Sequence, residues 1–245
     1  MRKVLITGAG NGVGKATAEI LKDEKLLLID IDEKNLKAVA KKLNCDYFVC
    51  DVTNVENIES LKQYVEKHFS KIDTLINCAG VWTKGEISQL NNEHFKKLNT
   101  LEKLKNIITT NTFGTIAMIT AFSPILINNA AVKRGVVSCQ IININSQSGV
   151  ETEEFCPVYN ASKHGSYYYR KAVQRDLAKH NVKITDVCPG LIKTDFYIRA
   201  NDELSSEIME LGLSAKQVAL TIKYVFDLPS DITIPSIEIR NIKNY

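Results

Sequence analysis

A glycine-rich turn ends the first apolar run of the chain and restricts the possible fold more than any other stretch. Val4–Ile6 has the length and β-branched content of a short strand, and apolar positions resume at helical spacing with Ala16, Ile20 and Leu21. The turn between them reads Thr7-Gly8-Ala9-Gly10-Asn11-Gly12-Val13-Gly14. The sequence therefore predicts a strand, a tight turn and a helix in direct succession.

A turn of this kind is suited to binding a phosphate. Glycine has no Cβ, so the backbone can approach a ligand closely, and the following helix offers unpaired N–H groups and the positive end of its dipole. The spacing Gly8-x3-Gly12-x-Gly14 differs from the G-x-G-x-x-G pattern. A tight turn that binds nothing remains the alternative. The candidate cofactor-binding residues here are Gly8, Gly10, Asn11, Gly12, Val13 and Gly14.

The composition allows one large α/β domain over residues 1–245 and disfavours several functions. The chain has 245 residues, 44% of them hydrophobic, and a net charge of +3 with lysines scattered among acids, which argues against a nucleic-acid partner. Six cysteines lack metal-ligand spacing and indicate a reducing compartment. The apolar region 107–127 is interrupted by Asn111 and Pro124, which favours a buried helix over a membrane span. We expect a cytoplasmic protein with no membrane contact and no metal site.

Strand and helix patterns alternate along the whole chain. This alternation predicts a doubly wound parallel sheet of about seven strands with helices on both faces. The segment from Val81 to Asn106 is polar and ambiguous, and we expect a surface excursion there. Expected strands cover residues 4–6, 26–29, 47–50, 74–76, 140–145, 183–187 and 236–240, and expected helices include 33–43, 55–69, 107–128 and 215–226.

Polar residues follow several of the expected strands, where open α/β sheets bind their ligands. Asp30 ends the second strand, and a carboxylate there can accept hydrogen bonds from an adenosine ribose and repel a 2′-phosphate. This favours NAD(H) over NADP(H), although Asp30 could instead cap the next helix. Further candidate cofactor contacts after the third and fourth strands are Asp51, Val52, Asn77, Ala79 and Gly80.

A second constellation lies in Tyr159-Asn160-Ala161-Ser162-Lys163. On a helix, Tyr159 and Lys163 share one face, and an ammonium near a phenol lowers the tyrosine pKa so that the phenol can act as acid or base. Ser146, at the end of the fifth strand, could direct its hydroxyl into the same cleft. An ordinary surface pair of tyrosine and lysine is the alternative.

Together these pieces resemble the short-chain dehydrogenase/reductase family over nearly the whole chain. The glycine turn, Asp51, Asn77-Cys78-Ala79-Gly80 and Pro189-Gly190 match its motifs, with Cys78 in place of the usual asparagine. The catalytic tetrad of the family is matched by Asn111, Ser146, Tyr159 and Lys163. The segment from Gly80 to Asn111 is longer than the family usually has by about two helical turns.

The resemblance implies a Rossmann fold and hydride transfer between a nicotinamide cofactor and a secondary alcohol or carbonyl. Tyr159 would exchange the proton, Ser146 would bind the substrate oxygen, and Lys163 would tune Tyr159 and hold the ribose. Asn111 would support a water relay, unless it is a satisfied buried amide or marks a kink. Residues expected beside the nicotinamide are Pro189, Gly190, Ile192 and Thr194. The family also implies a homodimer or homotetramer.

Two other functions and the substrate remain open at this point. A dinucleotide-sensing protein without catalysis would need no tuned Tyr159, and a methyltransferase would leave Ser146, Tyr159 and Lys163 unexplained. The substrate wall could include Phe155, Phe196, Tyr197, Ile198 and Met209, with charge from Glu151, Glu153, Glu154 and Arg199, or these could be lid packing and solvent-facing charge. Acids that faced the site would disfavour an anionic substrate.

Overall fold

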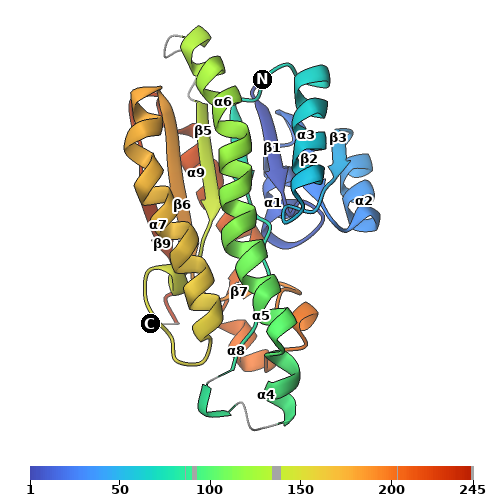
Figure 1. Cartoon of the computed structure of the whole chain (residues 1–245), viewed down its shortest axis with the longest axis vertical. Coiled ribbons are helices and arrows are strands. Elements are labelled where there is room, and N and C mark those ends of the chain that lie inside the picture. Colours follow the sequence, from blue (N-terminus) through green and yellow to red (C-terminus); the bar gives the residue numbers. More distant parts are fainter. Residues whose placement is uncertain (86, 90–92, 134–138, 203, 244–245) are drawn as a thin grey trace.

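The computed structural model describes residues 1–85, 87–89, 93–133, 139–202 and 204–243. These residues form a seven-stranded sheet in the order β3-β2-β1-β4-β5-β6-β9, in which every neighbouring pair is parallel (Figure 1). The order reverses direction between β1 and β4, which is where open α/β sheets form their binding crevice. The predicted doubly wound fold class is confirmed.

The strands match the expected segments to within one or two residues. Their bounds are β1 Lys3–Thr7, β2 Lys25–Asp30, β3 Asp46–Val49, β4 Thr74–Asn77, β5 Cys139–Ile144, β6 Val182–Pro189 and β9 Ser236–Ile239. Two short strands, β7 Ile192–Lys193 and β8 Leu213–Ser214, form a separate pair. The central strands are buried on both faces, because helices cover the sheet on both sides.

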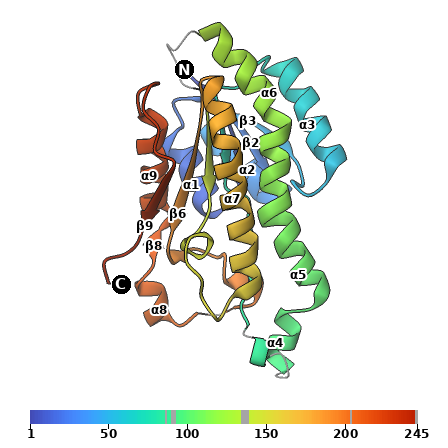
Figure 2. The same ribbon diagram turned by 60° about the vertical axis from the view of Figure 1, so that its left-hand side comes forward.

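The helices divide into two layers (Figures 1 and 2). The helices α1 Gly12–Ile20, α2 Glu33–Leu43 and α9 Ala215–Asp227 pack on one face of the sheet through the core cluster that contains Ile6 and Ile142. The helices α3 Val55–His68, α6 Thr115–Lys133 and α7 Pro157–Lys179 pack on the other face through the cluster that contains Leu5 and Phe122. The short helices are α4 Glu93–Leu98, α5 Leu101–Ile108 and α8 Ser206–Glu210.

The segment before Asn111 differs most from the sequence-based expectation. The helix expected at 107–128 begins at Leu101, because Thr100 caps α5 by accepting a hydrogen bond from the Lys103 backbone nitrogen at 3.3 Å. It passes through a π-helical turn at Thr109–Gly114 before α6. The expected surface excursion therefore contains α4 and α5, while residues 86 and 90–92 lie outside the described ranges.

The helical stretch Leu101–Ala131 has the length and the apolar content of a membrane span. Its sheet-facing side chains, such as Phe122 and Leu126, are fully buried in the core. This packing over the sheet accounts for the apolar residues in the buried third of the stretch.

The helix α7 carries both Tyr159 and Lys163. Pro157 occupies its first turn, where the fixed φ of proline suits a helix start. Tyr159 therefore lies inside the first turn of α7, and Lys163 lies one turn further along the same helix. This arrangement carries both side chains to the carboxyl ends of β4, β5 and β6.

Candidate active site

A cavity of about 1080 Å³ opens at the carboxyl ends of the strands. It is lined by the glycine turn, by the ends of β2, β4, β5 and β6, and by residues of the segment 189–208. All the site residues predicted from the sequence line it except Gly10, Asn77 and Asn111. Those that line it are Gly8, Asn11, Gly12, Val13, Gly14, Asp30, Asp51, Val52, Ala79, Gly80, Ser146, Tyr159, Lys163, Pro189, Gly190, Ile192 and Thr194.

Close backbone contacts explain the glycines of the turn. Gly8 has a φ of +65°, and a Cβ there would lie 2.8 Å from the Ala79 backbone nitrogen. A Cβ on Gly14 would lie 2.2 Å from the Gly8 carbonyl oxygen, so only glycine lets α1 start this close to the turn. The Thr7 hydroxyl accepts hydrogen bonds from the backbone nitrogens of Cys78 and Ala79 at 3.1 and 3.2 Å, which ties the turn to the end of β4.

The start of α1 has the features of an anion site. Asn11 occupies the N-cap position, but its side chain makes no capping hydrogen bond. The Asn11 Nδ2 atom is buried and has no hydrogen-bond partner among the described residues. The first turn of α1, all of whose residues the structure describes, carries no acidic residue. No carboxylate in this turn therefore balances the positive end of the helix dipole. An anionic phosphate fits these donors.

Asp30 is held in place by backbone N–H groups. Its Oδ2 atom accepts a hydrogen bond from the Gly10 nitrogen at 2.8 Å, and its Oδ1 atom accepts one from the Asp32 nitrogen at 2.9 Å. The capping alternative does not apply, because Asp32 caps α2 by accepting from the Asn35 nitrogen. Each Asp30 oxygen retains capacity for a second donor, such as a ribose hydroxyl. Gly10 lies behind Asp30, which explains its absence from the cavity wall.

Asp51 follows β3 at the same end of the cavity. Its Oδ1 atom accepts hydrogen bonds from the backbone nitrogen and the hydroxyl of Thr53, both at 2.8 Å. Its own nitrogen donates to the Asn57 side chain at 3.1 Å. We call this end of the cavity, formed by residues 8–14, Asp30, Asp51 and Val52, the cofactor half. Its side chains are held by local hydrogen bonds before any ligand binds.

Asn77 takes part in a polar row inside the sheet instead of lining the cavity. Its Nδ2 atom donates to Asn143 at 2.9 Å, and Asn143 donates to Asp186 at 2.9 Å, across the registered strands β4, β5 and β6. Arg170 from α7 completes the row by donating to Asp186 at 3.2 Å. Burial raises the pKa of Asp186 to about 6, despite the neighbouring Arg170. Asn77, although part of the sequence motif, therefore links the strands behind the site and does not line the cavity.

Asn111 lies in the π-helical turn, and its amide is fully engaged by neighbours. Its Nδ2 atom donates to the Val81 carbonyl at 2.9 Å and to the Ser162 hydroxyl at 3.0 Å, while its Oδ1 atom accepts from the Val81 nitrogen at 2.8 Å. A Cβ on Gly80 would approach the Asn111 oxygen to 3.3 Å. The geometry is that of the satisfied buried amide, and Asn111 anchors the chain where it leaves β4.

Ser146, Tyr159 and Lys163 meet in the middle of the cavity. Their exposed fractions are 9%, 6% and 5% respectively. The Ser146 hydroxyl accepts a hydrogen bond from the Ser148 nitrogen at 3.1 Å. The Lys163 Nζ atom lies 5.8 Å from the centre of the Tyr159 ring and donates to the Ile144 carbonyl at 3.0 Å. The structure therefore brings together three side chains that the sequence places on two separate elements.

Burial is the main influence on the protonation of this group. Burial raises the pKa of Tyr159 above its ordinary value, with a further contribution from Tyr197, while a hydrogen bond with Ser146 opposes the rise. Burial lowers the pKa of Lys163 to about 8. Lys163 is not among the groups that shift the Tyr159 pKa most, so the expected lowering of that pKa by Lys163 stays a prediction. These directions make Tyr159 a phenol and Lys163 an ammonium at neutral pH.

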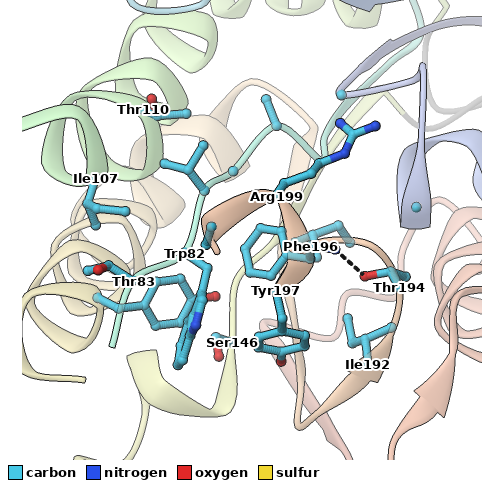
Figure 3. Close-up of a pocket in the computed structure, with 18 of the residues that line it drawn as sticks. Trp82, Thr83, Ile107, Thr110, Ser146, Ile192, Thr194, Phe196, Tyr197 and Arg199 are labelled. Carbon is cyan, nitrogen blue, oxygen red and sulfur yellow. Dashed lines mark hydrogen bonds between the residues drawn. The ribbon is translucent and has the colours of Figure 1, made fainter. Parts of the chain in front are cut away.

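Aromatic rings enclose the space beside Tyr159, which we call the substrate half: Trp82, Phe155, Phe196 and Tyr197. The Trp82 ring centre lies 4.6 Å from that of Tyr159 and 5.3 Å from that of Tyr197, both in edge-on arrangements. In the view of Figure 3, Ser146 lies between Trp82 and Tyr197. Of the five residues that the sequence suggests for an apolar wall, Phe155, Phe196 and Tyr197 line the cavity, whereas Ile198 and Met209 do not. The sequence does not single out Trp82 for this wall.

A buried carboxylate joins the two segments that carry these rings. Asp202 is 1% exposed, accepts a hydrogen bond from the Trp82 Nε1 atom at 2.8 Å and forms an ion pair with Lys84. Sequence reasoning missed this cluster, because Asp202 lies about 120 positions from its partners. Within the described ranges, no group of three or more histidine, cysteine, aspartate or glutamate side chains is arranged to hold a metal ion.

The family follows from these features together with sequence comparison. Residues 2–205 match the family model described as short chain dehydrogenase. The chain belongs to this family of oxidoreductases.

Relatives and solved structures agree with this assignment. An uncharacterised oxidoreductase of Staphylococcus epidermidis is 28% identical, over 97% of this chain and 96% of the relative. One from Staphylococcus aureus is 26% identical with the same coverage. An alcohol dehydrogenase from the archaeon Thermococcus sibiricus, complexed with 5-hydroxy-NADP, has a TM-score of 0.85 at 19% identity, covering 100% of this chain and 98% of its own. A serine dehydrogenase complexed with NADP+ has a TM-score of 0.86 at 24% identity, covering 99% and 96%.

Proposed function

We propose that this chain works as a single domain, residues 1–245, that transfers a hydride between a nicotinamide cofactor and a secondary alcohol or carbonyl compound. The observation that carries the proposal is the meeting of Ser146, Tyr159 and Lys163 in one cavity with the glycine turn. A proton-transfer group and an anion site in one cavity fit this reaction.

The cofactor half would hold the dinucleotide. The pyrophosphate fits the start of α1 with its buried, partnerless Asn11 Nδ2 atom. Asp30 would accept the ribose hydroxyls, which favours NAD(H), and its charge would repel the 2′-phosphate of NADP(H). Two solved structures with the same fold are complexes with 5-hydroxy-NADP and with NADP+. The preference of this chain for NAD(H) over NADP(H) therefore needs a direct test. The nicotinamide would lie near Pro189, Gly190, Ile192 and Thr194.

The residues of the catalytic group would each have a distinct part. The bound nicotinamide supplies or accepts the hydride. Ser146 would hydrogen-bond the substrate oxygen, and Tyr159, a phenol at neutral pH, is in the form that donates a proton to a carbonyl oxygen. Lys163, an ammonium below about pH 8, would stabilise the phenolate left behind and hold the ribose. Asn111 would act by fixing Val81 beside the site.

The other functions explain fewer of the residues. Burying the charged Lys163 costs free energy. A dinucleotide sensor without catalysis would gain nothing from this lysine beside a buried tyrosine. A methyltransferase would use the glycine turn and leave Ser146 and Tyr159 without a part. We also infer a cytoplasmic homodimer or homotetramer formed through the long helical segments that carry Asn111 and Tyr159, where Phe113 in the π-helical turn is exposed.

A turnover measurement with two tyrosine variants tests the proposal. Wild-type protein should reduce at least some members of a panel of ketones with NADH, and Tyr159→Phe should lower kcat/KM by about a thousandfold, because it removes the proton donor. Binding of NADH should change little. Tyr168→Phe, on the exposed side of α7, is the matched control and should be fully active. Substantial activity in Tyr159→Phe would refute the role given to that residue.

A further inference from the structure

The substrate half is lined mainly by apolar and aromatic side chains, with a few charged groups among them. The rings of Trp82, Phe155, Phe196 and Tyr197 form its wall. Lys84 lines the same region, but its charge is paired with the buried Asp202. Lys103 lines the cavity from α5 and is exposed to solvent, so water and salt screen its charge.

Of the four charged residues that the sequence suggested for the substrate wall, three are directed elsewhere. Glu151 forms an ion pair with Arg240 at 2.7 Å and does not line the cavity. Glu154 is exposed and does not line it either. Arg199 points away from the rings of Trp82 and Tyr197 in Figure 3, and its charge acts on Asp32 at the cofactor end.

Glu153 is the remaining residue, and it lines the cavity beside the catalytic tyrosine. Its Oε2 atom accepts weak hydrogen bonds from the Ser148 hydroxyl at 3.4 Å and the Cys156 thiol at 3.7 Å. Its negative charge raises the pKa of both Tyr159 and Tyr197, so it lies within electrostatic reach of the two hydroxyls that border the substrate half. Among the described residues, no cation forms an ion pair with Glu153.

We propose that the substrate is an apolar or aromatic alcohol or ketone that carries a protonated amino group, with Glu153 pairing the ammonium and the aromatic rings packing against the apolar body. This inference rests on the proposed function of the same site. A carboxylate in a cavity that is also lined by aromatic rings attracts cations, and it repels carboxylate or phosphate groups at the same position. The partial burial of Glu153 strengthens both effects relative to a fully exposed pair.

Three ketones that differ mainly in charge test this substrate class. They are acetophenones with an aminomethyl, an ethyl or a carboxymethyl group in the para position, reduced near neutral pH with NADH and with NADPH. We expect kcat/KM to fall in that order, with about a tenfold difference or more between the cation and the anion. Glu153→Gln should bring the three values to within about threefold of each other. Glu154→Gln, the exposed neighbour, should keep the wild-type order.

A binding measurement separates this inference from the proposed function. Trp82 is the single tryptophan and lies in the substrate half, so its fluorescence reports ketone binding in the presence of NAD+, where no reduction takes place. Tighter binding of the aminomethyl ketone, lost in Glu153→Gln, would support the inference even if no ketone were reduced, a result that would refute the proposed function alone. Equal or reversed binding order, or an order that persists in Glu153→Gln, would overturn the inference.

Discussion

The cofactor half and the substrate half of the cavity are stabilised in different ways. In the cofactor half, neighbouring backbone groups hold the side chains: Asp30 accepts from two N–H groups, and the glycine turn packs directly on the end of β4. In the substrate half, aromatic rings and the buried Asp202 connect segments that lie far apart in the chain. The first half is fixed by backbone donors and close backbone packing between adjacent strand ends, and the second by contacts between side chains on connecting segments.

This difference suggests a division of function between the halves. A dinucleotide cofactor has the same structure in every protein that binds it, so a binding site held rigidly by the backbone is suitable for it. A substrate wall made of side chains on connecting segments can change without disturbing the sheet. We therefore expect substitutions in the cofactor half to affect folding and cofactor binding together, and substitutions in the substrate half to affect substrate binding alone.

The largest effect is expected where the two halves meet, at Lys163. Lys163→Met should lower kcat/KM by about a thousandfold, because the phenolate of Tyr159 loses its stabilising charge. The pKa of Lys163 falls from 10.5 to about 8 in the folded protein, so the unfolded chain binds more protons between these pH values. The free energy of unfolding contributed by this residue therefore rises with pH across that window.

Denaturant unfolding of wild type and Lys163→Met over this pH range measures the effect. The thiols of Cys50 and Cys156 have raised pKa values that act in the opposite sense, but Lys163 is not among the groups that shift them, so their contribution cancels in the difference. A stability difference between the two proteins that does not change with pH would show that folding leaves the pKa of Lys163 unchanged, which would contradict the lowering described above.

The next largest effect is expected at Gly14. Gly14→Ala places a Cβ at 2.2 Å from the Gly8 carbonyl oxygen, so the turn and α1 must separate. We expect the free energy of unfolding to fall by about 3 kcal/mol and NADH affinity to fall by about tenfold or more. Lys15→Ala, at the next position of α1, is the control. Normal stability of Gly14→Ala with weakened NADH binding would contradict the expectation that folding and cofactor binding change together in this half.

More of the cofactor half than of the substrate half could be predicted from the sequence, for physical reasons. The strands, the glycine turn and the Tyr159–Lys163 pair follow from local spacing, and the structure places them at one edge of the sheet. Trp82 and Asp202 have no local pattern, since their contact depends on how two long loops pack. Asn77 matched a family motif, yet its hydrogen bond to Asn143 follows from strand register. The raised pKa of Tyr159 follows from burial, which spacing does not reveal.

The smallest effect is expected at Asp202 in the substrate half. Asp202→Asn keeps an acceptor for Trp82 but removes the ion pair with Lys84. We expect the KM for a ketone substrate to rise by about tenfold, equivalent to about 1.4 kcal/mol, with NADH affinity almost unchanged. Asp195→Asn, at an exposed cavity position, is the control. An equal loss of NADH affinity would show that these loops hold the cofactor as well.

The most direct measurement is a parallel titration of the protein with NADH and NADPH, in which energy transfer from Trp82, the single tryptophan, reports binding. The account predicts that both quench Trp82 fluorescence, that NADH binds at least about tenfold more tightly, and that Asp30→Ala removes most of this difference. Tighter binding of NADPH would contradict the part given to Asp30. Binding of neither nucleotide would contradict the assignment of the glycine turn and the cavity to a dinucleotide.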